Sequence, residues 1–205
     1  MFESYLRESI VARALKRKII SFSVLNPRDL TVDKHRTVDG RPYGGGPGMV
    51  LRAEPIAKAV KKILTKIARR KNPGKTKVLI MSAAGKPLTN KYADSLIAKY
   101  DDIVMISGRY EGIDARVKKM FRAEEVNIGP YVLTGGELPA MVIIDVITRR
   151  LPGVLGKDAS VEERRVSSSE VYTRPEVLEW EGKKYRVPKV LLSGHHGNID
   201  GWKEQ

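Results

Sequence analysis

The chain has 205 residues, of which 41% are hydrophobic, so it is long enough to fold around one sizeable core and is not disordered as a whole. It contains no cysteine, which excludes a disulfide framework and a thiolate metal site and fits a cytoplasmic protein. The formal net charge of +14, from 38 basic and 24 acidic residues, indicates either a polyanionic partner, above all nucleic acid, or a generally basic, solubilising surface.

The first elements are predicted from hydrophobic periodicity. Residues 2–18 place apolar side chains at helical spacing with cations on the other face, which predicts one amphipathic helix. Residues 19–27 alternate apolar and polar side chains up to Pro27, which predicts a strand. Residues 28–50 have no long periodicity, and their segment DGRPYGGGPGM is the kind of long glycine-rich loop that is usually functional or mobile.

Residues 55–68 predict a basic amphipathic helix, in which Pro55 takes a tolerated first-turn position. Its cations, on the helix or directly after it, are Lys58, Lys61, Lys62, Lys66, Arg69, Arg70 and Lys71. Either these side chains face phosphates, in which case binding falls steeply with salt, or they form an ordinary solvated helix face.

Residues 78–150 alternate short apolar segments with helical ones. Strands are predicted at 78–82, 102–107 and 123–129, and helices at 89–100, 115–121 and 138–150. Because the strands are apolar throughout, the sequence predicts an α/β domain with a mainly parallel sheet flanked by helices. Beyond residue 151 the sequence is irregular up to a short element at 185–194. No apolar run reaches the length of a membrane span, and no secretory signal or membrane association is predicted.

Three loops are predicted at the carboxyl ends of the strands, where ligands of parallel sheets collect: 82–86, 108–114 and 129–139. None matches the phosphate-binding or dinucleotide-binding glycine motifs. Glycines beside aromatic and aliphatic residues allow the backbone to approach a flat ligand, such as one containing adenosine. Taken singly, neither of the last two loops is specific. The loop at 108–114 is equally explained as a tight turn, and the loop at 129–139 as the start of a helix with an acidic first turn.

Six motifs, in order, carry a resemblance to a known family. They are HRTVDGRPYGGGPGMV, GRYEGIDARV, NIGPYVLTGGELPAMVIID, RRLPGVLG, YTRPEVLEW and LLSGHHGNIDGW. Together they resemble the bacterial tRNA (guanine-N1)-methyltransferases of the SPOUT superfamily from Phe2 to about Trp202. The resemblance implies a deep trefoil knot, a homodimer with active sites at the subunit interface, and S-adenosyl-L-methionine as methyl donor. It also implies methylation at N1 of the guanosine 3′-adjacent to the tRNA anticodon.

The resemblance assigns donor-binding roles residue by residue. The positions that match the family's donor site are Gly108, Ile128, Gly129, Pro130, Tyr131, Val132, Leu133, Gly135, Gly136 and Ser82. A magnesium requirement is also implied, although no carboxylate cluster of the sequence indicates one, and His35, His195 and His196 lack the spacing of a metal site.

The resemblance assigns two catalytic residues directly and leaves the position of a third, the general base, to be inferred. Glu111 matches the family's acidic residue near the donor and the target guanine, and Arg149 matches an arginine that positions the base. The family's general base is an aspartate, and an ungapped match puts Arg164 at that position. Since arginine stays protonated, we expect the neighbouring Glu163 or Glu162 to act instead, with Glu163 preferred; the alternative is that both are solvated linker charges.

The resemblance divides the chain into a methyltransferase domain with the knotted donor site at 1–155 and, at 156–205, an interdomain segment with a shortened tRNA-binding part. Family members also have a strand ahead of the first helix and a helical domain after the equivalent of Trp202. We therefore expect the shortened end to affect tRNA affinity and selectivity more than donor binding. Two alternatives stay open: a catalytically weakened RNA-binding protein, and a SPOUT methyltransferase with another RNA target.

Overall fold

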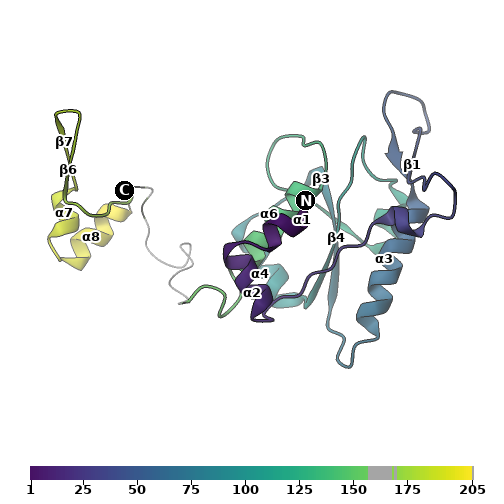
Figure 1. Cartoon of the computed structure of the whole chain (residues 1–205), viewed down its shortest axis with the longest axis horizontal. Coiled ribbons are helices and arrows are strands. Elements are labelled where there is room, and N and C mark those ends of the chain that lie inside the picture. Colours follow the sequence, from purple (N-terminus) through teal and green to yellow (C-terminus); the bar gives the residue numbers. More distant parts are fainter. Residues whose placement is uncertain (157–167, 169, 205) are drawn as a thin grey trace. The chain divides into compact units, whose positions relative to one another are not determined.

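The computed structural model describes residues 1–156, 168 and 170–204, which form two compact units, Met1–Val154 and Leu155–Gln205 (Figure 1). The functions that the sequence assigns to the two parts remain predictions.

The first unit is built around a three-stranded sheet. Its strands are β3 (Thr76–Pro87), β4 (Asp102–Ile106) and β5 (Glu124–Asn127), in the order β4-β3-β5. Both pairings are parallel, with Val78 opposite Val104 and Met81 opposite Val126. The predicted parallel sheet is confirmed, and β4 and β5 end on the same side of it. The loop predicted at 82–86 is wrong: these residues belong to β3, which continues past the end of β4 with a register shift against β5 between Met81 and Lys86.

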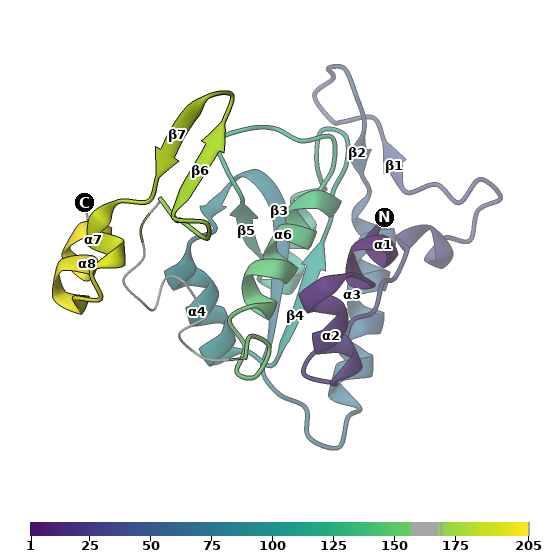
Figure 2. The ribbon, with the colours of Figure 1, turned by 60° about the vertical axis from the view of Figure 1, so that its left-hand side comes forward.

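Helices cover both faces of this sheet (Figures 1 and 2). One face carries α3 (Ala53–Ala68) and α5 (Arg116–Phe121). The other carries α1 (Phe2–Leu6), α2 (Ser9–Lys16), α4 (Asn90–Lys99) and α6 (Glu137–Thr148). The helices predicted from residues 55, 89, 115 and 138 onward are therefore confirmed to within a residue or two at most ends.

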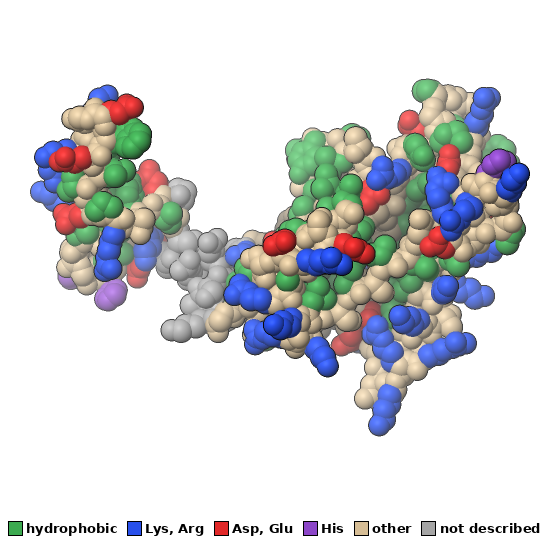
Figure 3. Space-filling model, in the orientation of Figure 1, with side chains coloured by type: hydrophobic (Ala, Val, Ile, Leu, Met, Phe, Trp, Pro, Cys, Tyr) green, Lys and Arg blue, Asp and Glu red, His purple; other side chains and the backbone are tan. Residues whose placement is uncertain are grey.

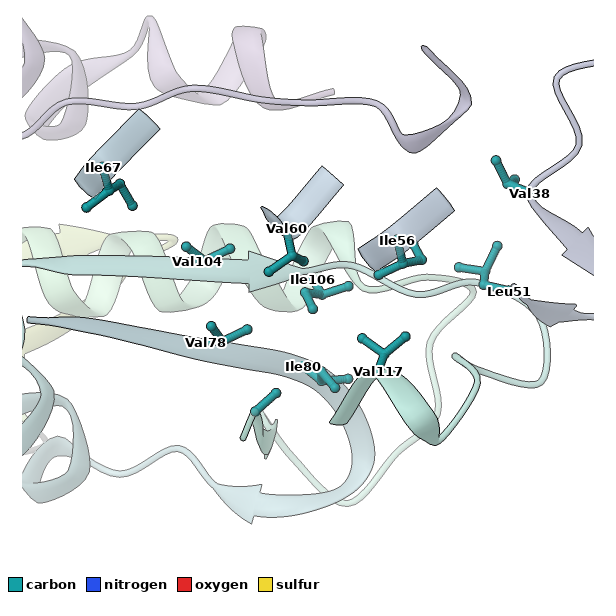
Figure 4. Close-up of a cluster of buried hydrophobic side chains, with 11 residues drawn as sticks. Val38, Leu51, Ile56, Val60, Ile67, Val78, Ile80, Val104, Ile106 and Val117 are labelled. Carbon is teal, nitrogen blue, oxygen red and sulfur yellow. The ribbon is translucent and has the colours of Figure 1, made fainter. Parts of the chain in front are cut away.

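The core beneath α3 explains why its sequence forms an amphipathic helix. Ile56, Val60 and Ile67 point from one face of the helix onto the sheet, as Figure 4 shows. They meet side chains of β3 and β4, namely Val78, Ile80, Val104 and Ile106. Each such buried aliphatic side chain contributes about 1.5–3 kcal/mol, so the apolar stripe fixes which face of α3 remains in water.

Two predictions for the first 50 residues are wrong. The single helix over 2–18 is two helices, broken between Leu6 and Ser9, where Ser9 has a φ of 49°. Residues 19–26 form no strand, and Pro27–Leu30 is a 3₁₀ helix, η1. Ile20 and Phe22 instead pack against the cluster of Leu6, Val11 and Ile144, so the alternation reflects packing on helices and not a sheet partner.

The glycine-rich segment is bounded by a minimal hairpin. β1 (Asp39–Gly40) pairs antiparallel with β2 (Val50–Leu51), which holds the two ends of residues 41–49 together. Between them Gly44, Gly45, Gly46 and Gly48 have φ between 79° and 106°, a region that other residues rarely adopt. The loop is thus anchored at its base.

The second unit contains a hairpin and two helices. β6 (Val177–Trp180) pairs antiparallel with β7 (Lys183–Arg186), and α7 (Lys189–Leu192) and α8 (His196–Lys203) follow. The ring centroids of Tyr172 and Trp202 lie 6.1 Å apart, so the segment before the hairpin packs against α8. The hairpin was not predicted, because its strands are short and exposed and carry little apolar alternation. No helix in the described part of the chain has the length and apolar character needed to cross a bilayer.

A hydrogen bond between α1 and α6 predicts a difference at high pH. Tyr5 Oη donates to Asp145 Oδ1 over 2.7 Å, and burial together with this carboxylate raises the pKa of Tyr5 to about 12. Because the folded pKa lies above the unfolded value of about 10, the stabilisation is complete below pH 10 and is lost as the pH rises through 12. We expect Tyr5→Phe to be less stable than the wild type at pH 8, with the difference shrinking above pH 10. Urea unfolding at several pH values measures it, and a difference independent of pH would contradict the assignment.

Candidate functional site

Two glycine loops meet at the carboxyl edge of the sheet. One follows β4 and the other joins β5 to α6. The backbone N–H of Gly136 donates to the carbonyl of Gly108 over 2.8 Å, and Ser107 Oγ donates to the carbonyl of Gly136 over 3.1 Å. An isolated bridge also pairs Arg109 with Gly135. The structure therefore brings together Gly108, Gly135 and Gly136, which are distant in sequence.

The close contact at Gly136 requires the absence of a side chain. A Cβ there would lie 2.7 Å from Ser107 Cα and 2.8 Å from Gly108 N. Both are backbone atoms that cannot rotate away, and Gly108 and Gly136 are buried. Glycine at this position is explained by the approach of two backbones, because Gly136 has an ordinary helical φ of −81°.

An ion pair links the same two loops. Arg109 Nε donates to Glu137 Oε1 over 2.9 Å, and the side chains are 50% and 21% exposed. Glu137 begins α6, where a carboxylate also interacts favourably with the helix dipole. The sequence analysis did not predict this pair. The only local signal for it is that Glu137 directly follows two glycines of one loop and Arg109 directly follows the glycine of the other.

The end of the glycine-rich segment packs against the loop that follows β4. The backbone N–H of Glu111 donates to Met49 O over 3.0 Å, and that of Leu51 donates to Gly112 O over 2.9 Å. Gly48 lies so close to Glu111 that a Cβ on Gly48 would be 2.5 Å from Glu111 Oε1. Residues 48–51 therefore fix the position of the exposed Glu111, a contact that the sequence did not predict.

Asp114 lies at the end of the loop that contains Glu111, just before α5 begins. Its carboxylate accepts two bonds from the Arg116 guanidinium, 2.9 Å from Nε and 2.6 Å from Nη2, and one from the Arg116 backbone. These bonds lower the pKa of Asp114 to about 2. Asp114 therefore stays ionised at neutral pH and acts as a fixed partner of Arg116.

The loop between β5 and α6 presents apolar side chains and unpaired backbone. Tyr131, Val132 and Leu133 are 52%, 85% and 39% exposed, and hydrophobic side chains gather over this loop in Figure 3. Within the described residues, the amides of Val132, Leu133 and Thr134 donate no backbone hydrogen bond. Apolar surface beside free amides suits a flat ligand with a polar edge.

The remaining donor positions lie on or beside this loop. Ile128 and Gly129 directly follow β5, and Tyr131 Oη donates to the carbonyl of Ile128 over 3.2 Å. Ser82 lies on β3, half-buried, directly after Met81, which packs beside Gly136. The predicted donor residues thus come from one edge of the first unit, with Pro130 exposed among them.

Arg149, the second predicted catalytic residue, is not part of this cluster. Arg149 caps the carboxyl end of α6, about 18 Å along the helix from Glu137 at 1.5 Å per residue. Glu163, with its neighbours Glu162 and Arg164, lies outside the described residues. In the part of the chain that the structure describes, no group of three His, Asp or Glu side chains could hold a metal ion.

The fold and the contacts described above define an α/β protein with a candidate ligand site, made largely of backbone, at the carboxyl edge of a parallel sheet. Comparison with known proteins defines it further. The family model described as tRNA (Guanine-1)-methyltransferase TrmD matches residues 1–205. The chain belongs to this family.

Individual relatives agree with the family match. The chain is 44% identical over 210 residues to a protein of Colwellia psychrerythraea named tRNA (guanine-N(1)-)-methyltransferase, covering 100% of the chain and 82% of the relative. Proteins of the same name from Aliivibrio fischeri (strain MJ11) and Desulforamulus reducens are 45% and 42% identical. These alignments cover 99% and 100% of the chain, and 79% of each relative.

Proposed function

We propose that the protein transfers the methyl group of S-adenosyl-L-methionine to N1 of the guanosine 3′-adjacent to the anticodon of tRNA. The observation that carries this proposal is the family match over residues 1–205. The contact of the Gly108 and Gly136 loops supports it, because both loops belong to the motifs that resemble the family's donor site.

The residues at the sheet edge fit such a donor. The free amides of residues 132–134 can pair with the edge of an adenine, and the side chains of Tyr131 and Leu133 can cover its faces. A Cβ at Gly129 would lie 2.3 Å from the Tyr131 ring and one at Gly135 2.4 Å from Glu137 Oε2, so glycine lets these side chains pack closely against the loop. When bound, S-adenosyl-L-methionine supplies the electrophilic methyl group.

The protein's own residues must prepare the guanine. Guanine N1 carries a proton and becomes a nucleophile only when a positioned base removes it, the role that we assign to the Glu163 carboxylate. The Arg149 guanidinium would stabilise the negative charge that then develops toward O6. Glu111, held against Gly48, would help to orient the base after its extrusion from the stack.

The site is best understood as shared between two subunits of a homodimer. Arg149 lies about 18 Å from the start of α6 in one chain, so a second copy is the natural source of a nearby arginine. Exposed apolar side chains on the loop before α6 and on the helix itself, such as Val132, Leu138 and Val142, offer a contact surface. We propose the deep trefoil knot on the family resemblance alone.

Two finer proposals concern location and metal. Because bacterial tRNA is methylated in the cytoplasm, we propose that the protein acts there. A magnesium requirement rests on the resemblance, and no described cluster of acids supports it, so no catalytic step is assigned to a metal.

The experiment is a transfer assay with labelled methyl donor and unmodified tRNA that has guanosine next to the anticodon. We expect labelled 1-methylguanosine at that position, and no product from the same tRNA with adenosine there. Binding of tRNA by folded protein without transfer would favour the weakened RNA-binding alternative. Label in a different nucleoside would favour another RNA target.

A further inference from the structure

The exposed face of α3 carries a row of cations. Lys58, Lys61, Lys62, Lys66 and Arg69 recur at spacings of three and four residues, which place them on one side of a helix. All five are exposed, opposite the buried stripe of Ile56, Val60 and Ile67. Figure 3 shows Lys and Arg side chains gathered over α3 and the loop after it.

This row lines two clefts. The first, of about 830 Å³, lies between the β1–β2 hairpin, α3 and α5, and its cations include Arg41, Arg52 and Arg116. The second, of about 620 Å³, lies between α3 and the extended residues 23–25, and its cations include Lys62, Lys66 and Arg69. Lys58 and Lys61 line both clefts, so the basic surface is continuous from one to the other.

Few acids neutralise this surface. Lys58 pairs with Glu54 over 2.8 Å, and Arg116 pairs with Asp114. Across the described residues, Lys61, Lys62, Lys66 and Arg69 have no carboxylate within ion-pair distance. The second cleft has no acidic side chain in its lining. Four like charges on one helix face repel one another at low salt, a cost that a bound polyanion removes.

The position of the row connects it to the candidate site. Asp114 and Arg116, which line the first cleft, directly follow the loop that contains Glu111. From there α3 extends for 16 residues, or about 24 Å, along the outside of the sheet. A strand of RNA whose base occupies the donor loops could therefore continue over this helix.

We propose that the α3 cation row binds the sugar-phosphate backbone of the tRNA strand whose guanosine is methylated. This inference rests on the proposed function for the identity of the RNA. Charge complementarity favours a nucleic-acid backbone, because the row offers several cations along one line. The helix itself carries no aromatic side chain, and the aromatic residues Tyr43 and Phe121 line only the first cleft. The row positions the RNA and does not choose its sequence.

The test neutralises the part of the row farthest from the donor loops. We expect the double variant K62Q/K66Q to bind tRNA about tenfold more weakly at physiological salt and to lower the slope of log affinity against log salt concentration by about 1–2. Affinity for S-adenosyl-L-methionine and the rate at saturating tRNA should stay at wild-type values.

The matched control is K91Q/K99Q, which removes two exposed lysines from α4 on the opposite face of the sheet. The inference is overturned if K62Q/K66Q keeps wild-type affinity and salt slope, or if the control loses as much. Failure of the proposed function is a different result: the wild type would bind tRNA with the expected salt dependence and yield no 1-methylguanosine.

Discussion

Replacing Gly136 with alanine is expected to weaken binding of S-adenosyl-L-methionine by at least about tenfold and to lower the free energy of unfolding by about 1–3 kcal/mol, the usual range for overpacking. The new Cβ would meet Ser107 Cα and Gly108 N at 2.7 and 2.8 Å, so the two loops must move apart. Their hydrogen bond from Gly136 N to Gly108 O would lengthen with that movement. Calorimetric titration with the donor and urea unfolding measure the two effects.

The control for this variant is Gly201→Ala. Gly201 lies inside α8, no described atom outside its own stretch of helix lies within 4 Å of where its Cβ would be, and alanine favours a helix by about 0.5–1 kcal/mol. Donor affinity should not change, and stability should stay equal or rise slightly. If Gly136→Ala behaved in the same way, the two loops would not be held together by backbone contact.

Replacing Glu163 with glutamine is expected to lower the methyl-transfer rate by about 10²–10⁴-fold, the contribution typical of a general base. Glutamine keeps the size and hydrogen-bonding ability of the side chain and cannot accept the N1 proton. Affinities for tRNA and donor should remain at wild-type values. Single-turnover transfer with both substrates saturating isolates the chemical step.

Glu162→Gln serves as the comparison, since it removes the same charge one residue away. Loss of rate in this variant with an unchanged rate in Glu163→Gln would move the base to Glu162. Unchanged rates in both would assign the proton to a group elsewhere and remove the segment from the chemistry.

The elements with strong periodicity could be predicted from the sequence. The stripe of Ile56, Val60 and Ile67 defined α3, and unbroken apolar runs defined the strands that became β3 and β4. These segments are buried on one or both faces, so burial alone determines their pattern. The parallel sheet followed from the alternation of strands and helices.

The wrong predictions concern segments whose structure is determined by tertiary contacts and not by the local sequence pattern. Alternation at Ile20 and Phe22 suited a strand, yet these side chains pack against helices and their backbone has no strand partner. The break before Ser9 has no glycine or proline to mark it. Neither feature could be derived without knowing what lies across from the segment.

The candidate site was predictable as a set of glycine loops at one sheet edge, because parallel strands bring their carboxyl ends together. The contacts that hold it were not. The pairing of Arg109 with Glu137, and the placement of Gly48 against Glu111, depend on how distant segments fold over one another. The position of Arg149 at the far end of α6 follows from the length of that helix.

The hydrogen bond between Gly136 and Gly108 has a consequence for the order in which parts of the protein fold. The proposed donor site draws on the loop after β4, which residues 48–51 hold in place, and on the loop after β5, so it can form only once β3 has paired with both neighbours. Such long-range pairing is slow compared with helix formation. A chain still emerging from the ribosome with residues up to β4 would therefore lack the proposed site. On this proposal, capture of the donor is a late event in folding, and a bound donor would stabilise the finished sheet by mass action.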